Sequence, residues 1–551
     1  MSLREHLEIR RRAGVPPMTF GGLVALARDL LGAGLSATTI FRVNAANFPD
    51  KAALLFEDEV LSYRGLLERV LRLAAALHAE GVRPGDRVVT LLRNSPRCVE
   101  MLGACQLLKA VHVPTSWRLK RDELAFIFAN AAPRVVVFEA DLGEELIPAL
   151  DAADLQGTTL LIAAGEAGVV GARAYERLVE GHAPRAPRVP RRSQARIMMY
   201  TSGTTGRPKG AIRSTEDRGA SEAFFRGVMR VAPLRHDDVH LTPCPLYHTA
   251  PWSFMGIYFT LGGTTLLMER FDPEEVLRLI ERHRVTTCTM VPTMYQRIVD
   301  LPEEVKRGYD VSSIRALIAT GSLLPVPLKE RVIERFGEVL YDFYGATELG
   351  WVTVATPEDL RVHRNTLGRP FPGTEIRLLD DAGAEVPVGE VGEIYARNPF
   401  TFDGYYRDAD ATAAMVREGF HSVGDMAWRD HVGYYFMADR KSDLVVSGGV
   451  NIYPAEIEQT LVSHPKVAEA AVIGVPDPEW GESLQAFVVP KPGRSVDEAR
   501  IIDYCAAHLA GYKKPKAVTF VDALPRNAQG KVLKRELREA ALRGSGAAPK
   551  A

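Results

Sequence analysis

The sequence lacks an excess of either charge. Its 551 residues include 68 lysines and arginines and 69 aspartates and glutamates, so the formal net charge is -1. A protein that binds nucleic acid without sequence preference needs a basic surface field, and this near-neutral chain does not have the composition for one. The sequence therefore argues against nucleic acid as a partner.

Cysteine is scarce, and none of it is arranged in pairs. There is no C-x-x-C motif among the five cysteines, which are Cys98, Cys105, Cys244, Cys288 and Cys505. An odd number of cysteines in a chain of this length suits free thiols in a reducing compartment. We expect all five to be small buried core residues, and we expect a cytoplasmic location.

Long apolar runs are also missing. The segment MSLREHLEIRRRAGVPP carries charges of both signs and lacks the apolar core that directs export. No stretch approaches the roughly 18 uninterrupted apolar residues that span a bilayer. We therefore expect no transmembrane segment, while peripheral membrane contact and a homodimer stay open.

The first half of the chain alternates helix-like and strand-like segments. Ser62 stands where it can cap a helix that ends near Gly81. Strand-like runs follow at 87–92, 134–140 and 158–164. Such alternation predicts an α/β fold, with a large N-terminal domain built mainly on parallel sheets.

The pattern changes twice toward the C-terminus. Short strands and turns after about residue 370 indicate a small β-rich unit, and Pro454 then stands at a plausible first turn of a helix. The last roughly 110 residues have the size and pattern of a separate α+β domain. We expect an N-terminal ATP- and acyl-binding domain at 1–438, a hinge at 439–442 and a mobile C-terminal cap at 443–551.

The segment YTSGTTGRPKG at 200–210 has the composition of an anion-binding loop. Its glycines let backbone N–H groups turn toward an anion, and its serine and threonines add hydroxyl donors. It is not a Walker A loop, because Lys209 follows a proline rather than a glycine. The residues favour phosphate binding over the alternative, a flexible surface loop.

This loop and six further motifs, in the same order, resemble those of the acyl-adenylate-forming enzymes, which include acyl-CoA synthetases, luciferases and peptide-synthetase adenylation domains. The further motifs are PLYHTA (245–250), ATGSLLP (319–325), YGATE (344–348), GEIYAR with SVGDMA, DRKSDLVVSGGVNIYPAEIE (439–458) and PRNAQGKVLKREL (525–537). They cover nearly the whole chain. The chain is therefore identified as a member of this superfamily, of the AMP-forming acyl-CoA synthetase type.

The resemblance implies a nucleotide site assembled from distant segments. Tyr344 would stack on adenine, with Gly345 beside it in the nucleotide site, and Thr347 would touch the α-phosphate. Asp425 and Arg440 would hold the ribose, and Gly321 and Ser322 would line the adenine side. The β- and γ-phosphates would lie on Thr201, Ser202, Gly203, Thr204, Thr205, Gly206 and Lys209.

The resemblance also implies the catalytic groups. Glu348 would bind Mg²⁺ beside the ATP phosphates, since a carboxylate suits that ion. Lys531 would neutralise the attacking carboxylate and the α-phosphate, which otherwise repel each other. Gly448 and Gly449 would line the pantetheine path of coenzyme A. Ser442 stands where the family's hinge usually has Asp or Lys. Lys513 and Lys514 are candidates for binding the phosphates of CoA.

His248, Thr249 and Gly345 would contact the acyl substrate, with His248 as a neutral gate and not a base. The gate region YHTAPWSFMG has no carboxylate, which disfavours amino-acid activation. Its apolar character predicts a medium- or long-chain fatty acid and a role in lipid metabolism. The alternatives are an aromatic or an alicyclic, steroid-type acid. A luciferase-like oxidoreductase and a non-catalytic ATP-binding scaffold are the rival functions.

The implied reaction consumes a carboxylic acid, ATP and CoA in two halves. The substrate carboxylate attacks the α-phosphorus of Mg-ATP, which gives an acyl-adenylate and pyrophosphate. The cap then rotates, withdraws Lys531 and presents the segment at 448–454, and the CoA thiol displaces AMP. Proximity in a closed site supplies much of the rate.

Overall fold

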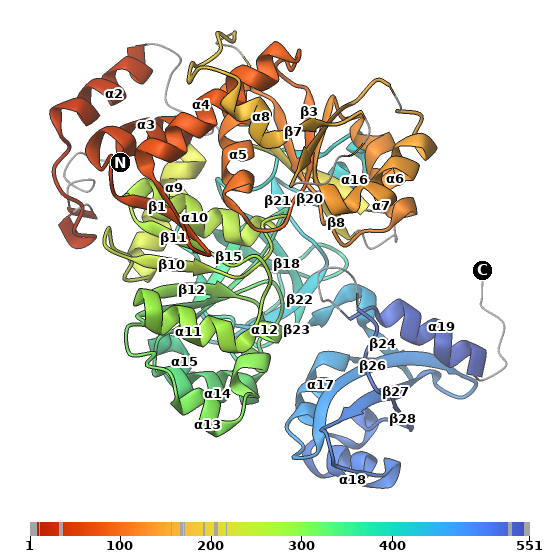
Figure 1. Ribbon diagram of the computed structural model, residues 1–551. Coiled ribbons are helices and arrows are strands. Elements are labelled where there is room, and N and C mark those ends of the chain that lie inside the picture. Colours follow the sequence, from red (N-terminus) through yellow and green to blue (C-terminus); the bar gives the residue numbers. More distant parts are fainter. Residues whose placement is uncertain are drawn as a thin grey trace.

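The computed structural model describes residues 8–9, 11–31, 37–155, 157–165, 169, 171–190, 193–202, 208–215, 218–526 and 532–544. Figure 1 shows a large N-terminal part made of sheets and covering helices, and a small C-terminal part to one side of it. This confirms the predicted α/β class and the expectation of a small C-terminal domain. The boundaries at 438 and 443 remain a proposal.

Two mainly parallel sheets form the frame of the large part. The first has nine strands, in the order β16 (Arg369–Pro370), β15 (Gly350–Ala355), β14 (Leu340–Ala346), β13 (Ala316–Ala319), β12 (Thr287–Met290), β10 (Val239–Thr242), β11 (Thr264–Leu267), β1 (Ala52–Phe56) and β2 (Glu59–Ser62). The five pairings from β14 across to β1 are parallel, and the outer strands are antiparallel. Strands β11, β12 and β13 are buried at every position, as expected for parallel strands covered on both faces.

The second sheet has eight strands, in the order β19 (Gly404–Tyr405), β9 (Pro208–Ser214), β8 (Arg196–Ser202), β4 (Val111–Pro114), β3 (Arg87–Leu91), β5 (Val135–Glu139), β6 (Leu160–Ala164) and β7 (Arg173–Ala174). Strands β9 and β19 pair antiparallel at its edge. The predicted phosphate loop joins β8 to β9, so it follows the carboxyl end of a strand, where α/β folds commonly place their ligands.

Helices cover these sheets. They are α2 (Phe20–Leu31), α3 (Ala37–Asn47), α4 (Tyr63–Ala79), α5 (Pro96–Leu108), α6 (Arg121–Ala131), α7 (Gly143–Ala152), α8 (Tyr175–Glu180), α9 (Arg218–Val231), α10 (Thr249–Leu261), α11 (Pro273–His283), α12 (Pro292–Val299), α13 (Glu303–Arg307), α14 (Val326–Phe336), α15 (Pro357–Val362) and α16 (Ala409–Ala414). Helix α4 begins as its sequence predicts, because the Ser62 side chain accepts a hydrogen bond from the Gly65 N–H.

The β-rich unit expected after residue 370 is an antiparallel sheet. Its strands are β17 (Glu375–Leu379), β18 (Gly392–Arg397), β20 (Val416–Arg417), β21 (Phe420–His421), β22 (Asp425–Arg429) and β23 (Tyr435–Arg440). Strand β23 includes Asp439 and Arg440, so regular pairing continues into the predicted hinge. A short 3₁₀ turn, Lys441–Asp443, follows it and contains Ser442.

In its described residues, the C-terminal part is a five-stranded sheet with three α-helices. Its elements are β24 (Val445–Ser447), β25 (Val450–Ile452), α17 (Pro454–Val462), β26 (Val467–Asp477), β27 (Gly481–Pro490), α18 (Glu498–His508), β28 (Ala517–Phe520) and α19 (Lys534–Gly544). Its own apolar core includes Ile457, Val472 and Ile501. The α+β pattern read from the sequence is therefore confirmed for this part.

Two further expectations bear on the whole chain. All five cysteines are buried and free, as expected. Within the described ranges, every helix is too short or too polar to cross a bilayer.

Candidate active site

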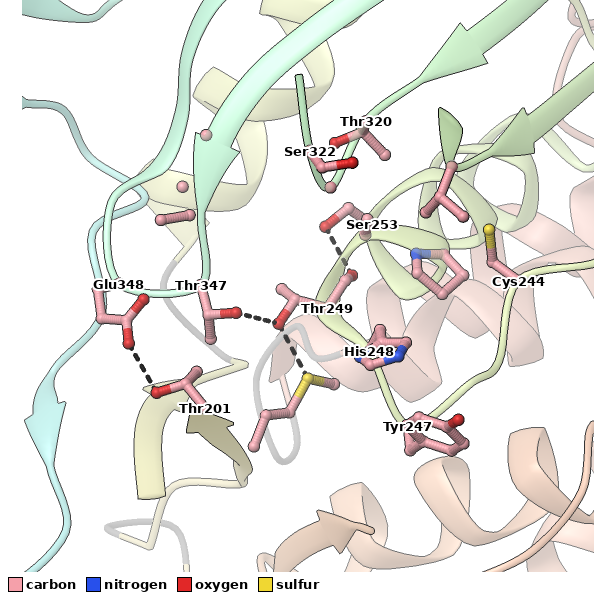
Figure 2. A pocket seen from close by; sticks show the side chains of 18 of the residues that line it. Thr201, Cys244, Tyr247, His248, Thr249, Ser253, Thr320, Ser322, Thr347 and Glu348 are labelled. Carbon is pink, nitrogen blue, oxygen red and sulfur yellow. Dashed lines mark hydrogen bonds between the residues drawn. The ribbon is translucent and has the colours of Figure 1, made fainter. Parts of the chain in front are cut away.

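A cavity of about 1350 Å³ lies where the two parallel sheets, the β-rich unit and the C-terminal part meet. Many residues that the sequence places in a nucleotide and acyl site line it together: Thr201, Lys209, His248, Thr249, Gly321, Ser322, Gly345, Thr347, Glu348 and Arg440. They come from segments separated by more than two hundred residues. Figure 2 shows part of this lining, with Glu348 and Thr347 on one side and the α10 segment on the other.

Glu348 is the carboxylate at the centre of this lining. It lies in the turn between β14 and β15 and is only 7% exposed. Its Oε1 accepts hydrogen bonds from the Thr201 hydroxyl at 2.9 Å and from the Tyr405 hydroxyl at 3.0 Å. These contacts tie the turn to β8 and β19, so the carboxylate is fixed by groups from two elements.

Thr347 links this turn to helix α10. Its hydroxyl lies 3.1 Å from the Thr249 hydroxyl, at the first residue of α10. Its backbone oxygen accepts a 2.8 Å hydrogen bond from the Arg213 guanidinium. Burial lowers the pKa of Arg213 to about 10, so this residue remains a cation at neutral pH.

Tyr344, Asp425 and Arg440 form a chain beside the cavity. The Tyr344 hydroxyl donates a 2.8 Å hydrogen bond to Asp425 Oδ2, and Arg440 Nε lies 3.3 Å from Asp425 Oδ1. Burial, with the Asp425 charge as the second cause, raises the pKa of Tyr344 well above its usual value, so the phenol stays protonated. Asp425 is 4% exposed, and both of its oxygens have partners.

His248 precedes α10, and its ring meets the Tyr247 ring edge-on at 4.5 Å. Burial, with a smaller contribution from Arg118, lowers the pKa of His248 to about 4. The imidazole is therefore neutral at pH 7. Its expected part in substrate placement stays a prediction.

Lys209 lies on β9, and its ammonium stands 5.1 Å from the centre of the Tyr405 ring. It faces the cavity at the same edge as Glu348. Ser202 ends β8. Gly203, Thr204, Thr205, Gly206 and Lys531 lie outside the described residues.

Gly448 and Gly449 do not line the cavity with the rest. They form the turn between β24 and β25, with φ angles of 57° and 78°, in the region that favours glycine. A Cβ at Gly448 would come within 2.7 Å of the Trp480 ring. From the C-terminal part, the cavity instead receives Glu469 and Arg526, which form an ion pair at 2.7 Å.

Sequence reasoning missed two residues of this site. Arg213 looks like an ordinary strand residue, and Tyr405 lies in a two-residue strand far from the phosphate loop. A signal existed for Arg213, because it follows Lys209 by four residues and so shares its strand face. For Tyr405 only the pairing of β19 with β9 reveals the contact.

Comparison with known proteins agrees with this geometry. The family model for AMP-binding enzymes matches residues 41–406, and the model for the AMP-binding enzyme C-terminal domain matches residues 456–531. The first match alone spans more than half of the chain.

Named relatives are CoA ligases. A feruloyl-CoA synthase from Amycolatopsis sp is 38% identical over 493 residues, which is 89% of this chain and 96% of that protein. An indoleacetate–CoA ligase from Aromatoleum aromaticum is 36% identical over 90% of this chain and 96% of its own length. Among solved structures, the anthranilate CoA ligase AuaEII in complex with anthranoyl-AMP has a TM-score of 0.84 and 27% identity, covering 93% of this chain and 98% of that one.

These names change one expectation. Ferulate, indoleacetate and anthranilate are aromatic acids, so the similarities favour the aromatic alternative over the expected fatty acid. They give no support to a role in fatty-acid or lipid metabolism. The error arose because an apolar gate was taken as a sign of an aliphatic chain, although an aromatic ring satisfies an apolar lining equally well.

Proposed function

The chain belongs to the AMP-binding enzyme family and is an AMP-forming CoA ligase, and we propose that its acyl substrate is an aromatic carboxylic acid. ATP and CoA are its other substrates. The observation that carries the proposal is that three aromatic side chains, Phe224, Tyr247 and Trp351, are among the residues that line the cavity. Such walls bury a flat ring well, and aromatic pairs prefer close, oriented contact.

The site residues divide the adenylation step among them. The Thr347 and Thr249 hydroxyls, 3.1 Å apart, would orient the acid's carboxylate against the α-phosphorus. Asp425 and Tyr344 would bind the ribose, and the hydrogen bond between them would weaken as the ribose hydroxyls compete for Asp425. Lys531 would neutralise the two anions as they meet, which is the electrostatic part of catalysis. His248, neutral at pH 7, would shape the acyl side and move no proton.

Glu348 fits the Mg²⁺ that ATP chemistry requires. Only one of its oxygens, Oε1, has the two hydroxyl partners described above. Within the described residues, no group of three or more His, Cys, Asp or Glu could hold a metal ion. Mg²⁺ usually keeps its waters and binds through one or two carboxylates together with substrate phosphates. Glu348 would therefore be the protein ligand, and the ion would supply positive charge beside the phosphates.

The C-terminal part would act as the mobile cap, with residues 439–442 as its hinge. Arg526, five residues before Lys531, lines the cavity, while the 448–449 turn does not. This orientation resembles what adenylation needs, because Arg526, the last described residue before Lys531, lines the cavity. Presentation of Gly448 and Gly449 for the CoA step would then require the cap to rotate about Ser442.

The proposal is tested by CoA-dependent release of AMP from the purified chain. The acids would include benzoate, 4-hydroxycinnamate and indole-3-acetate, with octanoate, palmitate and a steroid-type acid as the rivals. We expect kcat/KM to be highest for an aromatic acid. Preference for octanoate or palmitate would refute the proposal, and preference for the steroid-type acid would move it to the alicyclic class. Light emission with ATP and luciferin, or no AMP from any acid, would revive the two rival functions.

A further inference from the structure

Helix α10 carries a second hydroxyl into the cavity, one turn beyond Thr249. Ser253 lines the cavity and is half-buried. Its hydroxyl donates a 3.2 Å hydrogen bond to the Thr249 backbone oxygen. Four residues of an α-helix advance by about 6 Å, so the backbone of Ser253 lies about that far along α10 from the backbone of Thr249, which meets Thr347.

The direction of this bond decides what Ser253 can offer to a ligand. A serine hydroxyl has one proton and two acceptor lone pairs. The proton is committed to the Thr249 carbonyl, so the oxygen presents acceptor capacity to its surroundings. In Figure 2 the Ser253 oxygen lies on the side of α10 that faces Thr347 across the cavity. A substrate group that reaches it forms the better hydrogen bond as a donor.

The surroundings of Ser253 suit a flat ring. Trp351 lines the same cavity and is 8% exposed; its ring meets Phe343 edge-on at 5.4 Å and Phe254 at a tilt at 5.5 Å between ring centres. The cavity lining also contains Gly345 and Gly350, where an added Cβ would lie 2.1 Å and 2.8 Å from backbone oxygens. Only glycine fits at these two positions, so no side chain from them occupies the cavity.

Other groups of residues around the Thr347–Thr249 pair already have parts in the proposed function. Thr201, Lys209 and Glu348 mark the phosphate side, and Tyr344 with Asp425 marks the ribose side. The residues of α10 that line the cavity, which are Thr249, Ala250, Pro251 and Ser253, have no part in binding ATP, so we assign the acyl group to this path. A ring attached to the reacting carboxylate therefore extends toward Ser253.

We propose that Ser253 selects aromatic acids whose ring carries a hydrogen-bond donor, such as a phenolic O–H or an indole N–H, by accepting that hydrogen bond. This inference rests on the proposed aromatic-acid ligase function. It adds that a ring without a donor fits the same space but leaves the Ser253 oxygen without its ligand hydrogen bond, which costs binding. The discrimination falls on KM more than on kcat, because the contact is distant from the reacting atoms.

The experiment compares matched acids in which a hydroxyl is replaced by a methyl group of similar size. The pairs are 4-hydroxycinnamate with 4-methylcinnamate and 4-hydroxybenzoate with 4-methylbenzoate, and AMP release gives kcat and KM for each. We expect the wild-type chain to prefer the hydroxy acid of at least one pair by about tenfold in kcat/KM. Ser253→Ala, which suits a helix, should reduce that preference to about twofold or less.

Thr260→Ala is the matched control. The Thr260 hydroxyl makes the same kind of bond, 2.7 Å to the Gly256 backbone oxygen, but on the exposed face of α10 and away from the cavity lining. This variant should keep the wild-type preference. If Ser253→Ala keeps it as well, or if the wild-type chain shows none in either pair, the inference is wrong while the aromatic-acid function stands. If octanoate is turned over and no aromatic acid is, the proposed function itself fails.

Discussion

The cavity draws on two regions of the molecule that hold their residues in different ways. The large part supplies Thr201, Thr249, Thr347 and Glu348, and hydrogen bonds of 2.9–3.1 Å join them in two adjacent pairs. The described residues of the C-terminal part supply only Glu469 and Arg526, at the cavity edge. The large part holds a preorganised set of site residues, whereas the C-terminal part supplies groups at the edge of the cavity.

The junction between the regions bears on the proposed movement of the C-terminal part. Asp439, near the end of β23, accepts a 2.7 Å hydrogen bond from the Ala455 N–H in the first turn of α17. This is a helix cap supplied across the predicted hinge, of a kind that contributes about 1 kcal/mol. Burial raises the pKa of Asp439 above its usual range. Rotation about Lys441–Asp443 would break a contact of modest energy, which leaves the cap region free to take another orientation.

Removing the lysine of the C-terminal part should have the largest effect. We expect Lys531→Ala to slow acyl-adenylate formation by about a hundredfold or more, because an electrostatic group aimed at the reacting charges is lost. Thioester formation from supplied acyl-adenylate should be largely spared. ATP–pyrophosphate exchange measures the first half, and CoA consumption measures the second. Lys491→Ala, an exposed lysine of the same part, is the control, and equal loss in both halves would remove Lys531 from its assigned role.

Glu348→Gln makes the corresponding change in the large part. A hydrogen bond or ion contact to a charged group contributes about 2 kcal/mol, so we expect adenylation to fall about thirtyfold. The Mg²⁺ concentration for half-maximal rate should rise, since the neutral amide is a poorer ligand. Exposed Glu358→Gln on α15 should change neither quantity. An unaltered Mg²⁺ dependence in Glu348→Gln would show that this carboxylate does not hold the ion.

Acid should destabilise the large part before the small one. His112 and His240 are 1% and 0% exposed, and burial lowers the pKa of each to about 3. Below about pH 6.5 the unfolded chain binds protons at these residues and the folded chain does not, so the free energy of unfolding falls as pH falls. Between pH 6.5 and 5 the loss is about 2 kcal/mol per histidine.

Hydrogen exchange during urea unfolding, followed separately in the two parts, measures this effect. His240→Gln should flatten the dependence of the large part on pH. Both parts losing stability equally over this range would contradict the prediction.

The smallest effect should come from the edge of the nucleotide site. Tyr344→Phe removes the 2.8 Å hydrogen bond to Asp425 and leaves the aromatic face for stacking. We expect the KM for ATP to rise about fivefold, which corresponds to about 1 kcal/mol, with kcat little changed. Tyr434→Phe is the matched control, because it removes a 3.0 Å tyrosine–aspartate bond to Asp359 that does not belong to the cavity lining. An equal change in both variants would indicate a general loss of stability.

Several elements follow from local sequence. The Ser62 cap of α4, Pro454 at the start of α17 and the alternation of strands with helices are read correctly, because these features depend on neighbours a few residues apart. The hinge is harder to delimit, since β23 runs on to Arg440 through pairing with β22. That pairing involves a partner strand which local periodicity does not identify.

The sequence by itself determined the family, the α/β class and the types of residue at the site, because its motifs carry chemistry in a fixed order. Only the tertiary structure decided which of those residues meet. Thr201 and Glu348 are 147 residues apart and still share a hydrogen bond. Tyr405 and Arg213 join the same cluster although neither belongs to a sequence motif. Contacts of this kind depend on how two sheets close around one cavity. The free energy that stabilises this arrangement of the sheets comes from burial of the whole core. It cannot be read from the sequence of any single segment.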